Sequence, residues 1–331
     1  MAGTGRKKKV DAEAAAPREP VDRDEQLLVR AAWLAYVGGM TQAQVAKRLG
    51  MNRIRVNRML AQARDQGVVQ IRINSRIANC VALEERLRER YGLEDVIVVP
   101  SPSEAALVPQ TIAAAAGLAL SERVSNGMSV GIGWGRTLRY SIKSVAVRPV
   151  PGLSVVSLLG TLTGDSILNS YETASRFADL FDARCRYFAA PIFADTEASR
   201  DMFVRERILR EALDQAHKVD MAFISVGPVG RDTTNFRLGM ISEEDVISLT
   251  KAGAVGDLCA HFIDAHGELV DHPLNRRVIA LPPKALRDIK TVILASGGID
   301  KVAVLRAALR LGVVNVLVTD EKAAEGVLSE P

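Results

Sequence analysis

The chain has 331 residues, of which 48% are hydrophobic and 25% are charged. This length and composition predict a globular protein of about two domains with a substantial core, and they exclude a disordered or fibrous chain. The longest apolar runs fall short of the ~18–20 residues that a bilayer-spanning helix needs, so no membrane association is expected. The first residues contain no apolar segment of the kind that a secretory signal requires, so we expect a cytoplasmic protein.

Charge is distributed unevenly along the chain. Residues 1–76 carry 15 Lys and Arg against 7 Asp and Glu, a net charge of +8, whereas the remaining 255 residues carry 28 against 32, a net charge of −4. The N-terminal quarter is therefore predicted to bind a polyanion. Residues 1–22, which include Lys7, Lys8 and Lys9, are interpreted as a flexible basic tail.

Cysteine and histidine do not indicate a metal site. The three cysteines are odd in number and far apart, which supports neither a disulfide framework nor a cysteine metal site. The histidines at 261, 266 and 272 match no zinc-binding spacing. No G-x-S-x-G motif and no paired nucleophile and base are present, so we expect no catalytic residues, no metal and no cofactor.

Residues 23–76 are predicted to form a compact helix-turn-helix unit. Apolar residues recur at helical spacing from Asp24 and stop at a Gly-Gly pair. Thr41 and Gln44 have the T-x-x-Q spacing of a capping box, and the helix that follows ends at Gly50. Asn52 can cap a third helix. Residues 68–74 read VVQIRIN, an alternating pattern that predicts a strand or wing closing the unit.

The third helix carries the residue types that read DNA. In a helix-turn-helix the second of two helices enters the major groove, where Arg pairs with guanine and Asn with adenine. Basic residues at the end of the preceding helix suit phosphate contacts. A solvated basic helix hairpin is the structural alternative. The candidate DNA-binding residues are Thr41, Gln42, Lys47, Arg48, Asn52, Arg53, Arg55, Asn57 and Arg58.

Residues 77–91 are predicted to be a linker helix. Cys80, Leu83, Leu87 and Tyr91 fall on one side at near-heptad spacing. This stripe either pairs with its copy in another subunit or packs on its own domain, and the spacing alone does not separate the two.

Residues 92–331 alternate apolar strand-like runs with amphipathic helical ones, which predicts an α/β domain with a mostly parallel sheet covered on both faces. The strand-like runs are VIVVP, MSVGIG, LSVVSLLG, RYFAAP, MAFISVG, RRVIALP, TVILAS and NVLV.

The segment GIGWGRT, residues 131–137, lies at the end of one such strand and the start of a helix. Glycines there let backbone amides approach an anion, and Arg136 and Thr137 can add to the site. The segment is not a dinucleotide fingerprint, because Arg136 stands where the third glycine is needed. We interpret it as a candidate phosphate loop, with a purely structural glycine turn as the alternative.

Two further segments place charged residues next to glycines. In ASGGIDK, Lys301 lies in the first turn of a helix, where a cation is unfavourable unless an anion is near. In GAVGD, Asp257 follows a glycine turn and suits hydrogen bonds to sugar hydroxyls, although an N-cap role is equally compatible with the pattern.

In chain order, the segments TQAQVAKRLGMNRIRVNRMLAQARDQGVVQIRI, GWGRTL, GAVGD and GGIDKVAVLRAALRLGVVNVLVTDEKAA resemble the SorC family of bacterial sugar-responsive transcriptional regulators. The resemblance covers about residues 24–328. It implies a winged-helix-like DNA-binding domain, residues 23–76, joined to an effector domain similar to phosphosugar isomerases, residues 92–331. It also implies a homotetramer that controls a nearby catabolic operon.

The resemblance implies an effector site built from several separate segments. The segment NSYE, which contains Asn169 and Glu172, is similar to that of a subgroup that responds to sugar alcohols. The implied effector-binding residues are Gly133, Gly135, Arg136, Thr137, Asn169, Glu172, Arg237, Asp257 and Lys301.

The sequence therefore predicts a DNA-binding regulator of a carbohydrate or polyol operon, controlled by a sugar, a sugar alcohol or a phosphate of either. One alternative is an active phosphosugar isomerase fused to a DNA-binding module, for which Asp257 and Glu172 would be the acid and base candidates. Another is a constitutive repressor with a vestigial pocket. Activation and repression are equally compatible with the sequence.

Overall fold

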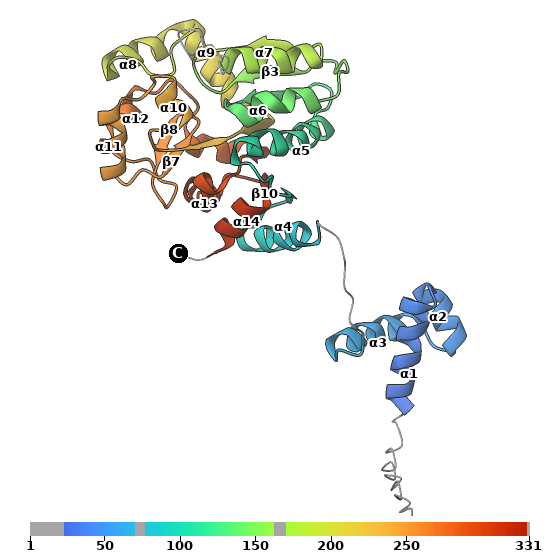
Figure 1. The fold of residues 1–331 in the computed structure, drawn as a ribbon. Coiled ribbons are helices and arrows are strands. Elements are labelled where there is room, and N and C mark those ends of the chain that lie inside the picture. The colour runs from blue at the N-terminus through green and yellow to red at the C-terminus, as the bar shows by residue number, and fades with distance from the viewer. Residues whose placement is uncertain (1–22, 70–76, 162–169, 330–331) are drawn as a thin grey trace, which may run out of the picture. The chain divides into compact units, whose positions relative to one another are not determined.

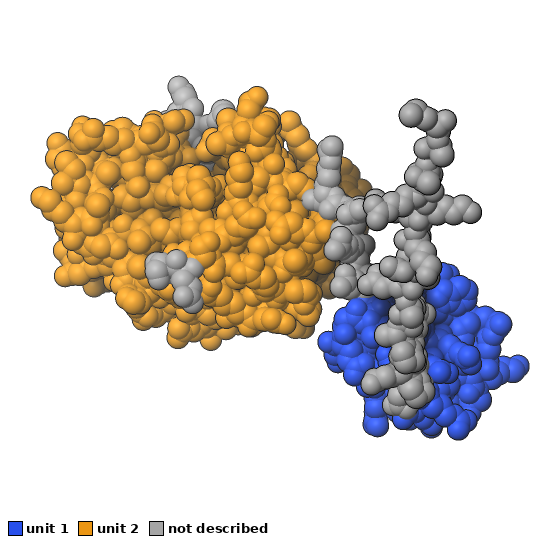
Figure 2. Space-filling view, turned by 60° about the horizontal axis from the view of Figure 1, so that its bottom comes forward, with its two compact units in different colours: residues 1–74 blue, residues 75–331 orange. Residues whose placement is uncertain are grey.

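The chain divides into two compact units, residues 1–74 and residues 75–331, which Figure 2 shows in different colours. The computed structural model describes residues 23–69, 77–161 and 170–329. The predicted basic tail and most of the predicted wing strand, residues 70–74, lie outside the described residues, as does Asn169.

The three helices predicted for the N-terminal unit are present (Figure 1). The first, α1 (Arg23–Ala32), continues into a short π-helical turn, η1 (Trp33–Val37), and is followed by α2 (Gln42–Leu49) and α3 (Arg53–Asp65). Their apolar faces meet in one small core because each helix is amphipathic. The core consists of Leu28, Ala31, Ala32, Val45, Ala46, Val56, Met59, Leu60 and Ala63.

Side-chain caps fix the ends of α2 and the start of α3. The backbone N–H of Gln44 donates to Thr41 Oγ1 at 3.3 Å, and that of Thr41 donates to Gln44 Oε1 at 2.8 Å, which completes the predicted capping box. Gly50 ends α2 in the left-handed conformation at φ 67°. Asn52 Oδ1 then accepts from the N–H of Arg55 at 2.8 Å and starts α3.

The C-terminal unit is built on a parallel sheet, as predicted, with helices around it (Figure 1). The sheet has seven strands. Its order is β1-β10-β9-β5-β2-β3-β4. The bounds of these strands are β1 Asp95–Val99, β2 Ser129–Ile132, β3 Ser154–Ser157, β4 Arg184–Arg186, β5 Met221–Ile224, β9 Thr291–Ala295 and β10 Val316–Asp320.

Helices cover both faces of this sheet, so its strands are buried on both sides. One face packs against α5 (Val108–Arg123), α6 (Arg136–Ser141) and α7 (Ser170–Leu180). The other packs against α4 (Ala78–Tyr91), α9 (Arg207–Ala216), α13 (Val302–Arg310) and α14 (Glu321–Leu328). Short 3-10 turns, η2 (Ala105–Leu107), η3 (Ile142–Ser144), η4 (Pro283–Asp288) and η5 (Ile299–Lys301), join these elements.

Among the described residues, one helical stretch, Ala105–Arg123, is long and apolar enough to cross a membrane. It is longer than the apolar runs on which the sequence-based expectation rested. Its residues Ile112, Ala116 and Leu120 are buried in the domain core, as expected for a helix that covers a parallel sheet.

The linker helix α4 packs on its own domain, which is the second of the two alternatives for its apolar stripe. Cys80, Leu83 and Leu87 are buried in the core beside β1 and α14. At the start of the helix, Asn79 Nδ2 donates to Glu321 Oε1 of α14 at 2.6 Å. These contacts make α4 part of the C-terminal unit.

A second, antiparallel sheet was not expected from the sequence. It consists of β6 (Val226–Pro228), β7 (Gly256–Leu258) and β8 (His261–Ile263), and it packs with α8 (Glu197–Arg205), α10 (Thr234–Arg237), α11 (Glu243–Lys251) and α12 (Pro273–Arg277). Two predicted strands were wrong in extent. The run RRVIALP begins in α12 and then makes isolated bridges only, and β4 ends at Arg186, where RYFAAP begins.

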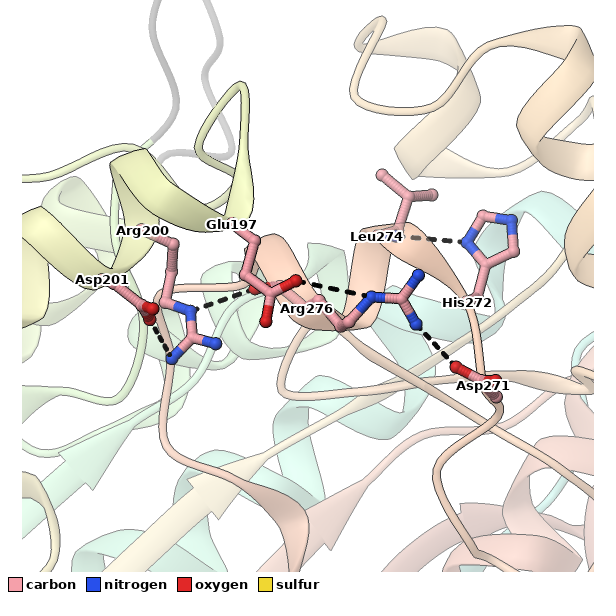
Figure 3. Close-up of polar contacts among 7 residues, drawn as sticks. All are labelled: Glu197, Arg200, Asp201, Asp271, His272, Leu274 and Arg276. Carbon is pink, nitrogen blue, oxygen red and sulfur yellow. Dashed lines mark hydrogen bonds and ion pairs between the residues drawn. The ribbon is translucent and has the colours of Figure 1, made fainter.

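Ion pairs join α8 to α12 at the surface (Figure 3). Arg276 Nε lies 3.6 Å from Glu197 Oε2, and its Nη1 lies 2.6 Å from Asp271 Oδ1. Arg200 Nε donates to the carbonyl oxygen of Arg276 at 3.0 Å. The His272 ring caps the first turn of α12, which gives this histidine a structural role. Exposed pairs of this kind stabilise by less than about 1 kcal/mol each, so they orient the helices more than they stabilise them.

Candidate functional site

A pocket of the C-terminal unit lies where the strand order of the parallel sheet reverses. From β2 the chain adds strands in one direction, through β3 to β4, and from β5 it adds them in the other direction, through β9 to β10. Loops that leave the carboxyl ends of neighbouring strands in opposite directions open a crevice between them, and ligands of open α/β sheets bind there.

The crevice holds a cavity of about 290 Å³. Its walls come from the segments that follow β2, β5 and β9 and from the small antiparallel sheet. The lining residues are Trp134, Gly135, Arg136, Ser225, Val226, Gly227, Pro228, Val229, Gly230, Arg231, Asp232, Thr233, Thr234, Asn235, Asp257, Asp300 and Lys301.

A buried carboxyl and amide form the polar floor of this cavity. Asp257 is 2% exposed, and its Oδ1 accepts from Asn235 Nδ2 at 2.8 Å while its Oδ2 accepts from the N–H of Ala260 at 3.2 Å. Burial raises the pKa of Asp257 to about 6, against the opposing effect of these two hydrogen bonds. The pair offers donor and acceptor groups of fixed geometry, which suits recognition of hydroxyl groups.

The position of Asp257 depends on a glycine in the neighbouring strand. Gly227 of β6 pairs with Asp257 of β7, and a Cβ atom at Gly227 would lie only 2.7 Å from Asp257 Oδ1. Any side chain there would displace the carboxylate from its amide partners. Gly227 therefore contributes to the site, because its lack of a side chain leaves room for the Asp257 carboxylate.

Two cations from different strand ends share the cavity with this acid. Lys301 Nζ donates to Ser296 Oγ at 3.2 Å, and Ser296 Oγ in turn donates to a backbone carbonyl of β6 at 3.2 Å. Burial lowers the pKa of Lys301, the positive charge of Arg136 lowers it further, and the carboxylates of Asp300 and Asp257 act in the opposite sense. A bound anion would offset both the burial and the repulsion between the two cations.

Four of the predicted effector residues lie together around the cavity, namely Gly135, Arg136, Asp257 and Lys301. Gly135 caps α6 with a φ of 128°, a conformation that a residue with a side chain rarely adopts. It thereby directs the chain from β2 into the helix and places Arg136 at the cavity.

The other described effector candidates lie outside the lining. Gly133 packs against β5, and Thr137 is buried within α6. Glu172 of α7 is paired with Arg176 at 2.6 Å. The Arg237 side chain is 66% exposed and lies 3.8 Å from Asp232.

The segment after β5 contributes most of the lining and was not predicted. It reads VGPVGRDTTN from Val226 to Asn235 and supplies both Gly227 and the amide partner of Asp257. The sequence contained a signal for this segment, a glycine-rich turn directly after an apolar strand. The same pattern identified GIGWGRT as a candidate phosphate loop.

In the N-terminal unit, the side chain of Gln42 in α2 is hydrogen-bonded to two polar side chains of α3. Arg53 Nε donates to Gln42 Oε1 at 3.5 Å, and Gln42 Nε2 donates to Asn57 Oδ1 at 3.2 Å. Arg55 instead turns toward α1, where its Nη2 lies 3.8 Å from Asp24 Oδ1. Lys47, Arg48 and Arg58 are exposed, while Thr41 and Asn52 act as caps.

Within the part of the chain that the structure describes, no three His, Cys, Asp or Glu side chains gather as metal ligands would. His261 is buried, and its Nδ1 lies 2.9 Å from the carbonyl oxygen of Cys259. Burial lowers the pKa of His261 to about 4, so the ring is neutral at pH 7.

Comparison with known proteins agrees with both units. Residues 75–329 match the family described as "Putative sugar-binding domain". The chain is 31% identical over 312 residues to the erythritol catabolism regulatory protein EryD of Brucella abortus, covering 94% of this chain and 98% of that one. It is 32% identical over 314 residues to the deoxyribonucleoside regulator of Bacillus subtilis, covering 94% and 100%.

Solved structures extend the likeness to the whole chain. The full-length sorbitol operon regulator SorC from Klebsiella pneumoniae superimposes with a TM-score of 0.73 at 26% identity, covering 93% of this chain and all of that one. A DeoR family transcriptional regulator from Listeria monocytogenes gives a TM-score of 0.70 at 28% identity over 75% of this chain and 99% of that one. The chain belongs to the SorC family of transcriptional regulators, with an N-terminal DNA-binding domain and a C-terminal sugar-binding domain.

Proposed function

We propose that this protein controls a carbohydrate or polyol catabolic operon, with α3 as its recognition helix and the cavity between β2 and β5 as its effector site. The observation that carries the proposal is the meeting of Arg136, Lys301 and the buried Asn235 and Asp257 pair in one cavity at the switch point of the sheet. Relatives named for erythritol catabolism and for deoxyribonucleosides support the same chemical class of effector.

The cavity is divided between two kinds of recognition. Asp257 and Asn235 suit hydroxyl groups, while Arg136 and Lys301 suit a phosphate or another anion. The volume of about 290 Å³ lies just below the ~300–1,000 Å³ typical of small-molecule pockets. A small sugar or sugar alcohol, free or phosphorylated, is therefore the proposed effector.

We further propose that the site binds its ligand without turning it over. Hydrogen bonds from Asn235 and Ala260 hold Asp257 in one position, and the lining described above contains no histidine that could move a proton. Regulators among the relatives support this reading. Incubation with sugar phosphates should yield no new product, and a product would favour the isomerase alternative.

The effector would act by favouring one arrangement of the subunits over another. DNA affinity then shifts only by the difference in ligand affinity between the two arrangements, and a coupling of ~1–3 kcal/mol, about 5–150-fold, is enough for control. A homotetramer, as the SorC resemblance implies, located in the cytoplasm as the sequence predicts, would supply such arrangements.

The test measures binding of the purified full-length protein to DNA from upstream of its own gene, at ~150 mM salt with random DNA as competitor. A panel of sugars and polyols, each free and phosphorylated, is added in turn. We expect one ligand to shift the DNA affinity several-fold. Specific binding that no ligand shifts would overturn the effector site, and binding no tighter than to random DNA would overturn the regulator itself.

A matched pair of lysine variants locates the effector site. Lys301→Gln should weaken binding of a phosphorylated effector by roughly 10–100-fold, because a charge-assisted hydrogen bond contributes about 1.5–3 kcal/mol. Lys290→Gln changes an exposed lysine just before β9, at the opposite end of the strand that leads to Lys301. Effector affinity that falls equally in both variants would place the ligand elsewhere.

A further inference from the structure

An apolar side chain lies at the centre of the side of α3 that faces away from the core of its unit. The buried stripe of this helix is Val56, Met59, Leu60 and Ala63. At about 3.6 residues per turn, positions 54 and 58 lie opposite that stripe, one turn apart. Ile54 is 75% exposed and Arg58 is exposed beside it.

The polar residues on either side of Ile54 are held away from it. Arg53 is drawn toward Gln42 of α2, and Arg55 is drawn toward Asp24 of α1. Asn52 is fixed as the helix cap. The methyl and ethyl groups of Ile54 are thus presented at the first turn of the recognition helix, the part that enters deepest into a major groove.

We infer that Ile54 reads the 5-methyl group of a thymine in the operator. Thymine differs from the other bases in that its major-groove edge carries a methyl group beside a hydrogen-bond acceptor. Contact between that methyl and Ile54 removes both from water. Arg58, one turn further along α3, then lies in place to reach a neighbouring base pair.

The inference rests on the proposed recognition helix, and uracil substitution tests it separately. A duplex is first enriched from random-sequence DNA by the wild-type full-length protein. Each thymine of that duplex is then replaced singly by uracil, which removes the methyl group and leaves every hydrogen-bonding group in place. Affinities are measured by fluorescence anisotropy for wild type, Ile54→Ala and Ile54→Val.

At one thymine of each half-site, we expect uracil to weaken wild-type binding roughly three- to fivefold, the effect expected for one methyl group withdrawn from water. The same replacement should not change the DNA affinity of Ile54→Ala, because this variant lacks the side chain that contacts the methyl group. The effects of changing two groups in contact are not additive. Ile54→Val should retain part of the sensitivity. Val37→Ala, which truncates an apolar side chain that is 69% exposed in the same unit, should respond as wild type does.

Two results would contradict the role of Ile54, and a third would contradict the proposed recognition helix as well. Wild-type binding that is insensitive to every uracil would overturn the role of Ile54. So would a uracil effect that persists unchanged in Ile54→Ala. If the wild-type protein enriches no duplex at all, the proposed recognition helix fails and the inference fails with it.

Discussion

The two units of this chain place their binding groups in opposite surroundings. The candidate DNA-binding residues run from Thr41 to Arg58, on two adjacent helices and at their N-caps, and most are exposed to water. The effector cavity draws on segments as far apart as Trp134 and Lys301, and its central acid is buried. The DNA-binding surface is built from residues that are close in sequence and face water. The effector cavity is built from segments far apart in sequence, around an acid that is already buried in the folded domain.

This difference has an energetic consequence. Groups that face water and do not cap a helix give up hydration only when DNA binds, so changing them should alter DNA affinity and leave folding nearly untouched. Groups such as Asp257 lost their hydration when the domain folded, so changing them alters the stability of the domain as well as ligand binding. Perturbations of pH and of single side chains should therefore separate the two units.

The largest expected effects are the opposing pH-dependent contributions of two buried groups, Asp257 and His261, to the stability of the C-terminal unit. The pKa of Asp257 is about 6 in the folded state against 3.8 for an ordinary Asp, so the folded state holds this proton more firmly. The contribution of Asp257 to the free energy of unfolding should therefore fall by roughly 3 kcal/mol as pH rises from about 4 to 6. The pKa of His261 is about 4 against 6.5, so this group changes the free energy in the opposite direction over nearly the same pH window.

Two variants separate these opposing contributions. With increasing pH between 4 and 6, Asp257→Asn should gain stability relative to wild type, whereas His261→Asn should lose it. Urea unfolding at pH 4, 5 and 6 measures both, with Trp134 fluorescence as the signal in a Trp33→Phe background that silences the other unit. A stability difference that does not change with pH would mean that the variant residue is not titrating as described.

A smaller effect is expected at the DNA-binding surface. Arg58→Ala should weaken specific DNA binding by about 1–3 kcal/mol, roughly 5–150-fold, if the guanidinium reads a base. Binding of the effector to the other unit should stay at the wild-type value. Arg86→Ala, which changes an exposed arginine of α4, is the charge-matched control. An equal loss on random DNA would instead assign Arg58 to a phosphate contact.

The same contrast explains which features the sequence revealed. The caps at Thr41, Gly50 and Asn52 were predictable, because each depends on residues no more than four positions away. The parallel sheet was predictable because its buried strands are continuous apolar runs. Strands β6, β7 and β8 have three residues each, too few for a periodic signal, and they are identified only by pairing with one another.

Within the effector site, the same limit applies residue by residue. Arg136 and Lys301 were predicted because each lies next to glycines at the start of a helix that follows an apolar strand, and the SorC resemblance placed them in one site. Asn235 was missed because its partner Asp257 is brought to it by the unexpected sheet. Arg237 was implied by the SorC resemblance but lies outside the lining, since a family resemblance does not fix the direction of a side chain.

The smallest predicted effect tests whether the units fold independently. Thr41→Ala removes the acceptor for the N–H of Gln44 and should lower the stability of α2 and α3 by about 1 kcal/mol. Thr196→Ala removes the corresponding acceptor for the N–H of Ser199 at the start of α8.

Hydrogen exchange measured by mass spectrometry resolves the two regions. Each variant should speed exchange only in its own unit, because stability differs between local cooperative regions. Faster exchange in β9 of Thr41→Ala would show that the N-terminal unit stabilises the effector domain, and the contrast between the units would then describe their binding chemistry and not their folding.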